Sequence, residues 1–149
     1  MKPLDDQRGF SLLEVMTALV VLTVGMMGIA AMQDIAISRS VDANELSLAT
    51  NLAVEMAERV QYSRKNVVSY NGITVSAASA TCPATPSMVN GDCTQWRTRL
   101  VASRLPNVLG TVQVATVGPT SMNQWQVTVQ ITWTGLILPV TFSSVVSLG

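Results

Sequence analysis

The chain has 149 residues, and its nine Lys or Arg balance its nine Asp or Glu, so its formal net charge is zero at pH 7. A nucleic-acid-binding domain would normally be strongly basic, so this composition argues against that class. Histidine is absent from the sequence, which removes the commonest general base and metal ligand. The length suits one membrane helix followed by one small domain.

The N-terminal stretch joins a short polar leader to a long apolar run. From Val15 to Met32 the sequence holds neither a charged residue nor a proline, and a helix of this length spans about 27 Å, close to a hydrocarbon core. Glu14 directly precedes this apolar run. A charge that enters lipid is costly, so we expect Glu14 to be functional and to pair with a cation at the same depth. Cleavage between Gly9 and Phe10 would supply one, as a free α-amino group.

The stretch Gly9-Phe10-Ser11-Leu12-Leu13-Glu14, with the apolar segment behind it, resembles the class III signal of type IV prepilins and type II secretion pseudopilins. The resemblance covers residues 1–33. It implies that a prepilin peptidase cuts after Gly9 and N-methylates Phe10. It also implies that Glu14 pairs with the N-terminal amine of a neighbouring subunit during assembly.

Two other interpretations of the apolar run stay open. An ordinary secretory signal is one of them, because Gly28-Ile29-Ala30 is an acceptable small-x-small cleavage site. A plain signal anchor, with Glu14 snorkelling to the membrane interface, is the other. Neither gives a reason for the spacing between Gly9, Phe10 and Glu14.

One long helix is predicted from Ser11 to Ser63, roughly 80 Å in length. No proline falls between Pro3 and Pro83. The half beyond residue 33 is amphipathic, and an apolar stripe should pack on a partner surface. The stripe consists of Val41, Leu48, Ala49, Leu52, Ala53, Met56 and Val60. The carboxylates Glu45, Glu55 and Glu58 are predicted to form a solvated face, with Glu55–Arg59 as an i,i+4 pair.

The segment from Val67 to Cys93 is predicted to be a loop with one short strand around Ile73 and Val75. If it faces an oxidising periplasm, a disulfide between Cys82 and Cys93 is the expected state. Free thiols and a metal site are the alternatives. Two cysteines without histidine are too few ligands for structural zinc, so we expect no metal.

Beyond the cysteines we expect one short helix and then strands. One face of a predicted helix that begins near Asp92 or Thr94 and stops at Pro106 consists of Trp96, Leu100, Val101 and Leu105. Strands are predicted over residues 111–117, 124–134 and 140–148, with a bulge in the last one near Ser143-Ser144. The middle strand alternates strictly, as expected for a sheet with one wet face. Its inward set is Trp125, Val127, Val129, Ile131 and Trp133.

These elements predict an α+β fold in which the amphipathic half of the long helix packs against a small antiparallel sheet. This is the lollipop arrangement of type IV pilins. The predicted parts are a prepilin leader (1–9), a transmembrane and assembly helix (10–33) and a periplasmic pilin head (34–149).

We expect neither an enzyme nor a cofactor, because no nucleophile-base pair, phosphate loop or metal spacing is visible in the sequence. Arg97, Arg99 and Arg104, beside Trp96, are candidates for contact with a ligand such as single-stranded DNA. A small cationic helix beside a core tryptophan is the simpler interpretation, and we do not expect a nucleic-acid partner.

The chain looks like a minor pilin, and residues 9–16 together with residues 96–107 most closely resemble the PilV-type pilus modification proteins. It implies a non-catalytic subunit of the bacterial inner membrane, with a periplasmic head, that is incorporated into the pilus. The implied partners are prepilin peptidase, other minor and major pilins, the inner-membrane assembly platform and the lipid bilayer. A minor pseudopilin of type II secretion is the nearest alternative, and a pilus-borne adhesin or DNA-binding module is an alternative of another class.

Overall fold

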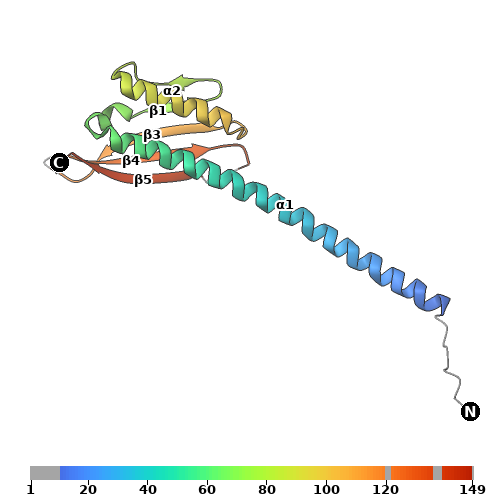
Figure 1. The fold of residues 1–149 in the computed structure, drawn as a ribbon. Coiled ribbons are helices and arrows are strands. Elements are labelled where there is room, and N and C mark those ends of the chain that lie inside the picture. The colour runs from blue at the N-terminus through green and yellow to red at the C-terminus, as the bar shows by residue number, and fades with distance from the viewer. Residues whose placement is uncertain (1–10, 120–121, 136–138, 149) are drawn as a thin grey trace, which may run out of the picture. The chain divides into compact units, whose positions relative to one another are not determined.

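The computed structural model describes residues 11–119, 122–135 and 139–148. Gly9 and Phe10, on either side of the predicted cleavage site, lie outside the described residues. The elements follow one another along the chain as Figure 1 shows. They are α1 (Leu12–Tyr62), the 3-10 helix η1 (Arg64–Tyr70), β1 (Ile73–Ser76), β2 (Ala80–Thr81), α2 (Ser87–Ala102), β3 (Leu109–Thr116), β4 (Gln124–Thr132) and β5 (Val140–Ser147).

The chain divides into two compact units, one up to Asp42 and one from Ala43 onward. The predicted long helix is confirmed, since α1 begins and ends within one residue of the predicted bounds. In the first unit every described side chain is exposed. Among the described residues, α1 is the one helix long and apolar enough to cross a membrane, and none of its apolar window is buried. Its apolar surface therefore needs lipid or another protein around it.

The apolar stripe of α1 becomes buried later along the helix than the sequence predicts. Val41 was expected in the stripe, but its side chain is 51% exposed. It lies in the first unit, where every described side chain is exposed. Full burial begins at Ala49 and ends at Val60. The seven-residue spacing of Val41 and Leu48 predicted the apolar face of α1 correctly. It did not predict the residue at which that face becomes buried.

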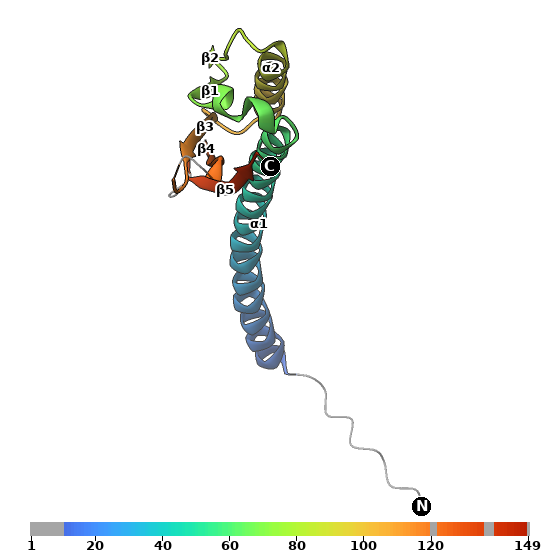
Figure 2. The same cartoon turned by 90° about the vertical axis from the view of Figure 1, so that its left-hand side faces the viewer.

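The second unit is an antiparallel sheet of five strands with helices on one face. The strand order is β2-β1-β3-β4-β5, and Figures 1 and 2 show the second half of α1 together with α2 on the same side of that sheet. The two helices and the inner sheet face share one hydrophobic core. The predicted α+β fold, with a long helix packed against a small antiparallel sheet, is confirmed.

The strands follow the predicted period of two. Val127, Val129 and Ile131 of β4 are buried, and the Gln and Thr side chains between them are partly or fully exposed. The bulge predicted near Ser143-Ser144 is wrong, because both serines pair with β4 in an unbroken register. Ser144 lies opposite the buried Val127, at an inward position where an apolar residue is usual. A serine at this position makes the pattern look out of phase although the backbone is regular.

Helix α2 begins earlier than predicted, at Ser87 and not at Asp92 or Thr94. Pro86 caps it with an extended backbone, φ −68° and ψ 154°, which suits the residue just before a helix. Val89 and Cys93 are buried on the same face as Trp96. The expected loop from Val67 to Cys93 is therefore wrong in its last seven residues, and it also contains the end of η1 and the short β2.

A disulfide links Cys82, just after β2, to Cys93 in α2, and the two Cα atoms lie 5.7 Å apart. The bond joins the edge of the sheet to the first turns of the helix. This confirms the cysteine pairing that the sequence predicts.

Reduction of this disulfide is expected to lower the free energy of unfolding by about 3 kcal/mol, since the cross-link closes a short loop in the unfolded chain. Chemical denaturation of the full-length protein in detergent, with and without reductant, measures the change. Cys82→Ser with Cys93→Ser should match the reduced protein. Protein taken from its native membrane should show no free thiol under denaturing alkylation, and full labelling would contradict the prediction.

Candidate functional site

The first candidate site is the start of α1, where Glu14 precedes the apolar run. The backbone N–H groups of Glu14 and Val15 donate to the carbonyl of Ser11 over 2.9 and 3.2 Å, which closes the first turn. A carboxylate in a first helical turn is favoured by the unpaired N–H groups and by the helix dipole. The Glu14 side chain is exposed, and no basic side chain among the described residues forms a salt bridge with it. The position thus presents one carboxylate to whatever surrounds the helix.

The surface behind Glu14 is apolar on every side of the helix. Side chains around the full circumference are exposed, including Leu13, Val21 and Met27. A helix that is apolar all round is stable only inside a membrane or inside a bundle of other helices. Glu14 and this surface therefore form one continuous element that is completed by contacts outside the chain.

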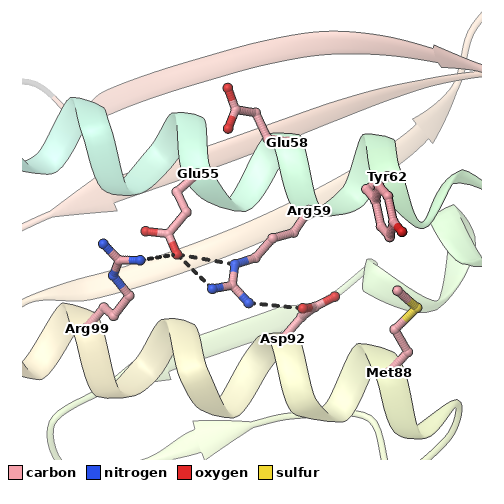
Figure 3. A pocket seen from close by; sticks show the side chains of 7 residues that line it. All are labelled: Glu55, Glu58, Arg59, Tyr62, Met88, Asp92 and Arg99. Carbon is pink, nitrogen blue, oxygen red and sulfur yellow. Dashed lines mark hydrogen bonds and ion pairs between the residues drawn. The ribbon is translucent and has the colours of Figure 1, made fainter.

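The second candidate site is a network of charged side chains between α1 and α2, shown in Figure 3. At its centre is Glu55, whose Oε1 accepts hydrogen bonds from Arg59 Nε and Nη2 over 3.2 and 2.8 Å. The same oxygen accepts from Arg99 Nη1 of α2 over 2.9 Å. The predicted Glu55–Arg59 pair is confirmed, but Glu55 is part of a contact between helices and not of a solvated face.

Arg59 continues this network toward the core. Its Nη1 donates to Asp92 Oδ1 and to Gln95 Oε1, both over 3.0 Å. Asp92 Oδ2 accepts from the hydroxyl of Tyr70 over 2.5 Å. Burial alone would lower the pKa of Arg59, but hydrogen bonds and charge attraction from Glu55 and Asp92 outweigh burial and raise it. The guanidinium therefore stays charged and holds α1 against α2.

An open pocket lies over this network. Glu58, Tyr62 and Met88 complete its lining, and Figure 3 shows the Glu58 carboxylate pointing away from the ion pairs. Glu58 thus fits the predicted solvated face. Glu45 does not fit it, because its Oε2 accepts a hydrogen bond from Trp133 Nε1 over 2.9 Å.

Tyr70 makes the network sensitive to alkaline pH. Burial and the hydrogen bond to Asp92 raise the pKa of Tyr70 from 10.0 to about 12. The unfolded tyrosine ionises first, so the stability that Tyr70 contributes is complete below about pH 10 and is lost as the pH rises to about 12. Absorbance titration of Tyr62→Phe, in which Tyr70 is the one remaining tyrosine, measures this pKa. Asp92→Asn should lower it, and a titration midpoint near 10 in the folded Tyr62→Phe protein would contradict the assignment.

The three candidate arginines contact different parts of the chain. Arg97 Nε and Nη2 donate to the carbonyls of Ser76 and Ala77, at the end of β1, over 3.1 and 3.0 Å. Arg99 pairs with Glu55 on α1. Arg104 follows α2, is exposed and has a φ of 59°. Since Arg97 and Arg99 are held by separate acceptors, contact of all three with one ligand stays a prediction.

The comparisons with known proteins concern the first candidate site. A family model described as the prokaryotic N-terminal methylation motif matches residues 4–30. This range contains the predicted cleavage site, Glu14 and most of the apolar run, and it supports a type IV prepilin-like protein. Neither the curated proteins nor the solved structures gave a match.

Proposed function

We propose that this chain is a minor pilin, a structural and non-catalytic subunit that helps to initiate the assembly of a type IV pilus. In this proposal prepilin peptidase cuts after Gly9 and N-methylates Phe10. The protein then stands in the bacterial inner membrane, with residues 34–149 in the periplasm, until it enters the pilus. The observation that carries the proposal is the methylation motif over residues 4–30, joined to a helix with a membrane-length apolar window of which no part is buried.

The proposed mechanism uses two properties of α1. Its apolar side chains have similar surroundings in a bilayer and in the helical centre of a filament, so transfer between the two exposes little apolar surface to water. Glu14 would pair with the Phe10 amine of a neighbouring subunit, and in a low-dielectric environment that charge pair favours one axial register. The head would then select neighbours through its polar surface.

The finer assignment to the PilV-type pilus modification proteins follows from the resemblance of residues 9–16 and of the segment 96–107. In the structure this segment contains Trp96, which is buried and donates from Nε1 to the Leu52 carbonyl over 3.0 Å. The partners proposed on this basis are other minor and major pilins and the inner-membrane assembly platform.

A minor pseudopilin of type II secretion is the alternative that the same motif supports. Deletion of the gene separates the two functions. Loss of surface pili with normal secretion supports the pilin, and loss of secretion with normal pili supports the pseudopilin. A ligand-binding role for Arg97 and Arg99 would require them to exchange their present acceptors for the ligand, so the geometry favours an assembly role over an adhesin or DNA receptor.

The intact mass of the protein purified from the membranes of its native host tests the proposal. A species that begins at N-methylated Phe10 is the expected result. A species that begins at Ala31 would indicate an ordinary secreted domain, and an unprocessed chain would indicate a signal anchor. Replacing Gly9 with a bulky residue should leave the leader attached, and a mature-length product from that variant would contradict the proposed site.

A further inference from the structure

The two edges of the sheet are built differently. One edge is β2, which has only two residues. The other is β5, which has eight residues and is last in the strand order, next to β4. No described residue pairs with the outer edge of β5. A long open edge is unusual, because its unpaired N–H and C=O groups can accept another strand.

β5 also lacks the features that commonly prevent such pairing. Short length, charged side chains, proline and bulges are the usual protection of an edge strand. Residues 140–147 contain neither a charge nor a proline, and their pairing with β4 runs without a bulge. The opposite edge is protected by its shortness alone. The sequence therefore leaves one particular edge available.

The register shows which backbone groups face outward. The N–H of Leu148 donates to the carbonyl of Asn123, and hydrogen-bonded pairs alternate along an antiparallel ladder. The even-numbered residues of β5 therefore bond to β4, and the odd-numbered ones direct their N–H and C=O groups to the open edge. The outward-directed set is Thr141, Ser143, Val145 and Ser147.

The outer face of the sheet beside this edge is uncharged. The register places one set of side chains on the face away from the helices, and every member of the set is exposed or partly exposed. The set consists of Thr74, Ser76, Thr81, Leu109, Thr111, Gln113, Ala115, Gln124, Gln126, Thr128, Gln130, Thr132, Thr141, Ser143, Val145 and Ser147. Depletion of charge is the compositional mark of a protein interface core.

We propose that β5 is a docking edge onto which an uncharged extended strand from the head of a different pilin-like subunit is added. Four outward N–H groups and four outward C=O groups, repeating every second residue, are complementary to the backbone of another strand. The uncharged outer face then favours a strand whose own side chains are uncharged. That the donor is a pilin-like subunit rests on the proposed function, whereas the docking edge itself does not.

A second copy of β5 fits the site less well. Antiparallel pairing of two identical edge strands requires a two-fold axis normal to the sheet. That axis would reverse the direction of residues 43–62, which lie along the sheet face (Figures 1 and 2). Residues 43–62 would then run in opposite directions in the two paired heads. A strand from a different subunit has no such constraint.

Amide hydrogen exchange tests the docking edge without knowledge of the donor. The full-length protein is labelled in the membranes of its native host and, separately, as a purified monomer in detergent. The peptide that contains β5 is expected to take up about four fewer deuterons in the membrane sample, since four outward amides gain partners. Equal uptake in the two samples would overturn the proposal.

Substitutions at Val145 supply the matched variants. Val145→Pro removes an outward N–H without breaking a bond to β4, and proline is accepted on strand edges. Val145→Lys adds a charge at the same point. Gln126→Lys is the control, because Gln126 pairs with Val145 on the same face but lies in β4, inside the sheet. Both Val145 variants should lose the extra protection in membranes while their melting temperatures in detergent stay unchanged, and Gln126→Lys should keep it.

The outcomes separate this proposal from the proposed function. Protection that survives in both Val145 variants, or that is lost equally in Gln126→Lys, would overturn the docking edge. A dimer of the purified protein linked through Val145→Cys would show that the occupant is a second copy and would overturn the proposed donor. A mature protein that does not begin at Phe10 would overturn the pilin assignment alone, and the exchange experiment would still decide whether β5 is occupied.

Discussion

Glu14→Gln is expected to leave processing intact but to reduce incorporation into sheared surface pili at least about ten-fold. The variant keeps the size and the hydrogen-bonding capacity of the side chain and removes only its charge. In the proposed assembly it leaves the Phe10 amine of the neighbouring subunit without a counter-ion at the edge of the apolar core. An uncompensated charge in lipid costs about 3 kcal/mol on insertion scales, and about 1.4 kcal/mol corresponds to a factor of ten.

Two measurements are needed for this variant. The intact mass of the membrane-bound protein checks that cleavage still occurs, and quantitative immunoblotting of sheared pili measures incorporation relative to the membrane pool. Asp34→Asn is the matched control, since Asp34 is also an exposed carboxylate on α1 but lies beyond the apolar run. Normal incorporation of Glu14→Gln would show that the charge does not direct assembly.

The elements that the sequence predicted well are those whose pattern is local and repeats many times. Helix α1 was predicted to within one residue at each end because no proline interrupts it over fifty residues. The strand β4 was predicted because apolar and polar side chains alternate along its whole length. In α1 and β4, each further helical turn or pair of strand residues repeats the same periodic pattern and so strengthens the prediction.

Helix α2 was predicted only in part, although a usable pattern was present. Val89, Cys93, Trp96 and Leu100 are spaced as one face of a helix, and all four are buried. The polar residues between them and the cysteine pair favoured a loop. Counting Cys93 as a small apolar residue, which is its usual environment in proteins, would have placed the start of the helix correctly.

The polar network could not have been predicted from local pattern. Arg59 lies 33 residues from Asp92, and Tyr70 lies 22 residues from it. Their contacts depend on how α1 and α2 cross, which no periodicity within either helix defines. Nor does local pattern predict that Arg97 and Arg99 donate hydrogen bonds to acceptors on different elements. The N-terminal motif, by contrast, is a linear pattern, and the family model matches it over residues 4–30.

Gly110→Ala is expected to destabilise the head by about 2 kcal/mol, the usual cost of overpacking a core. Gly110 lies in β3 opposite the buried Ile131. A Cβ added there would lie 2.6 Å from Cη2 of Trp96 and 2.8 Å from Cδ1 of Leu100. The indole cannot move away easily, because it is fully buried and its Nε1 is bonded to the Leu52 carbonyl.

Thermal and chemical unfolding of the full-length protein in detergent measure this change, and about 2 kcal/mol corresponds to a shift of roughly ten degrees in the melting temperature of a small domain. Gly91→Ala is the matched control. Gly91 lies within α2 and a Cβ there meets nothing within 4 Å, so alanine should stabilise the helix by up to about 1 kcal/mol. In a Trp96→Phe background, which removes Cη2, Gly110→Ala should cost less, and this coupling identifies the indole as the source of the strain. An unchanged melting temperature for Gly110→Ala alone would mean that Trp96 and Leu100 can move together without loss of packing, and that the contact between α2 and β3 is looser than the structure indicates.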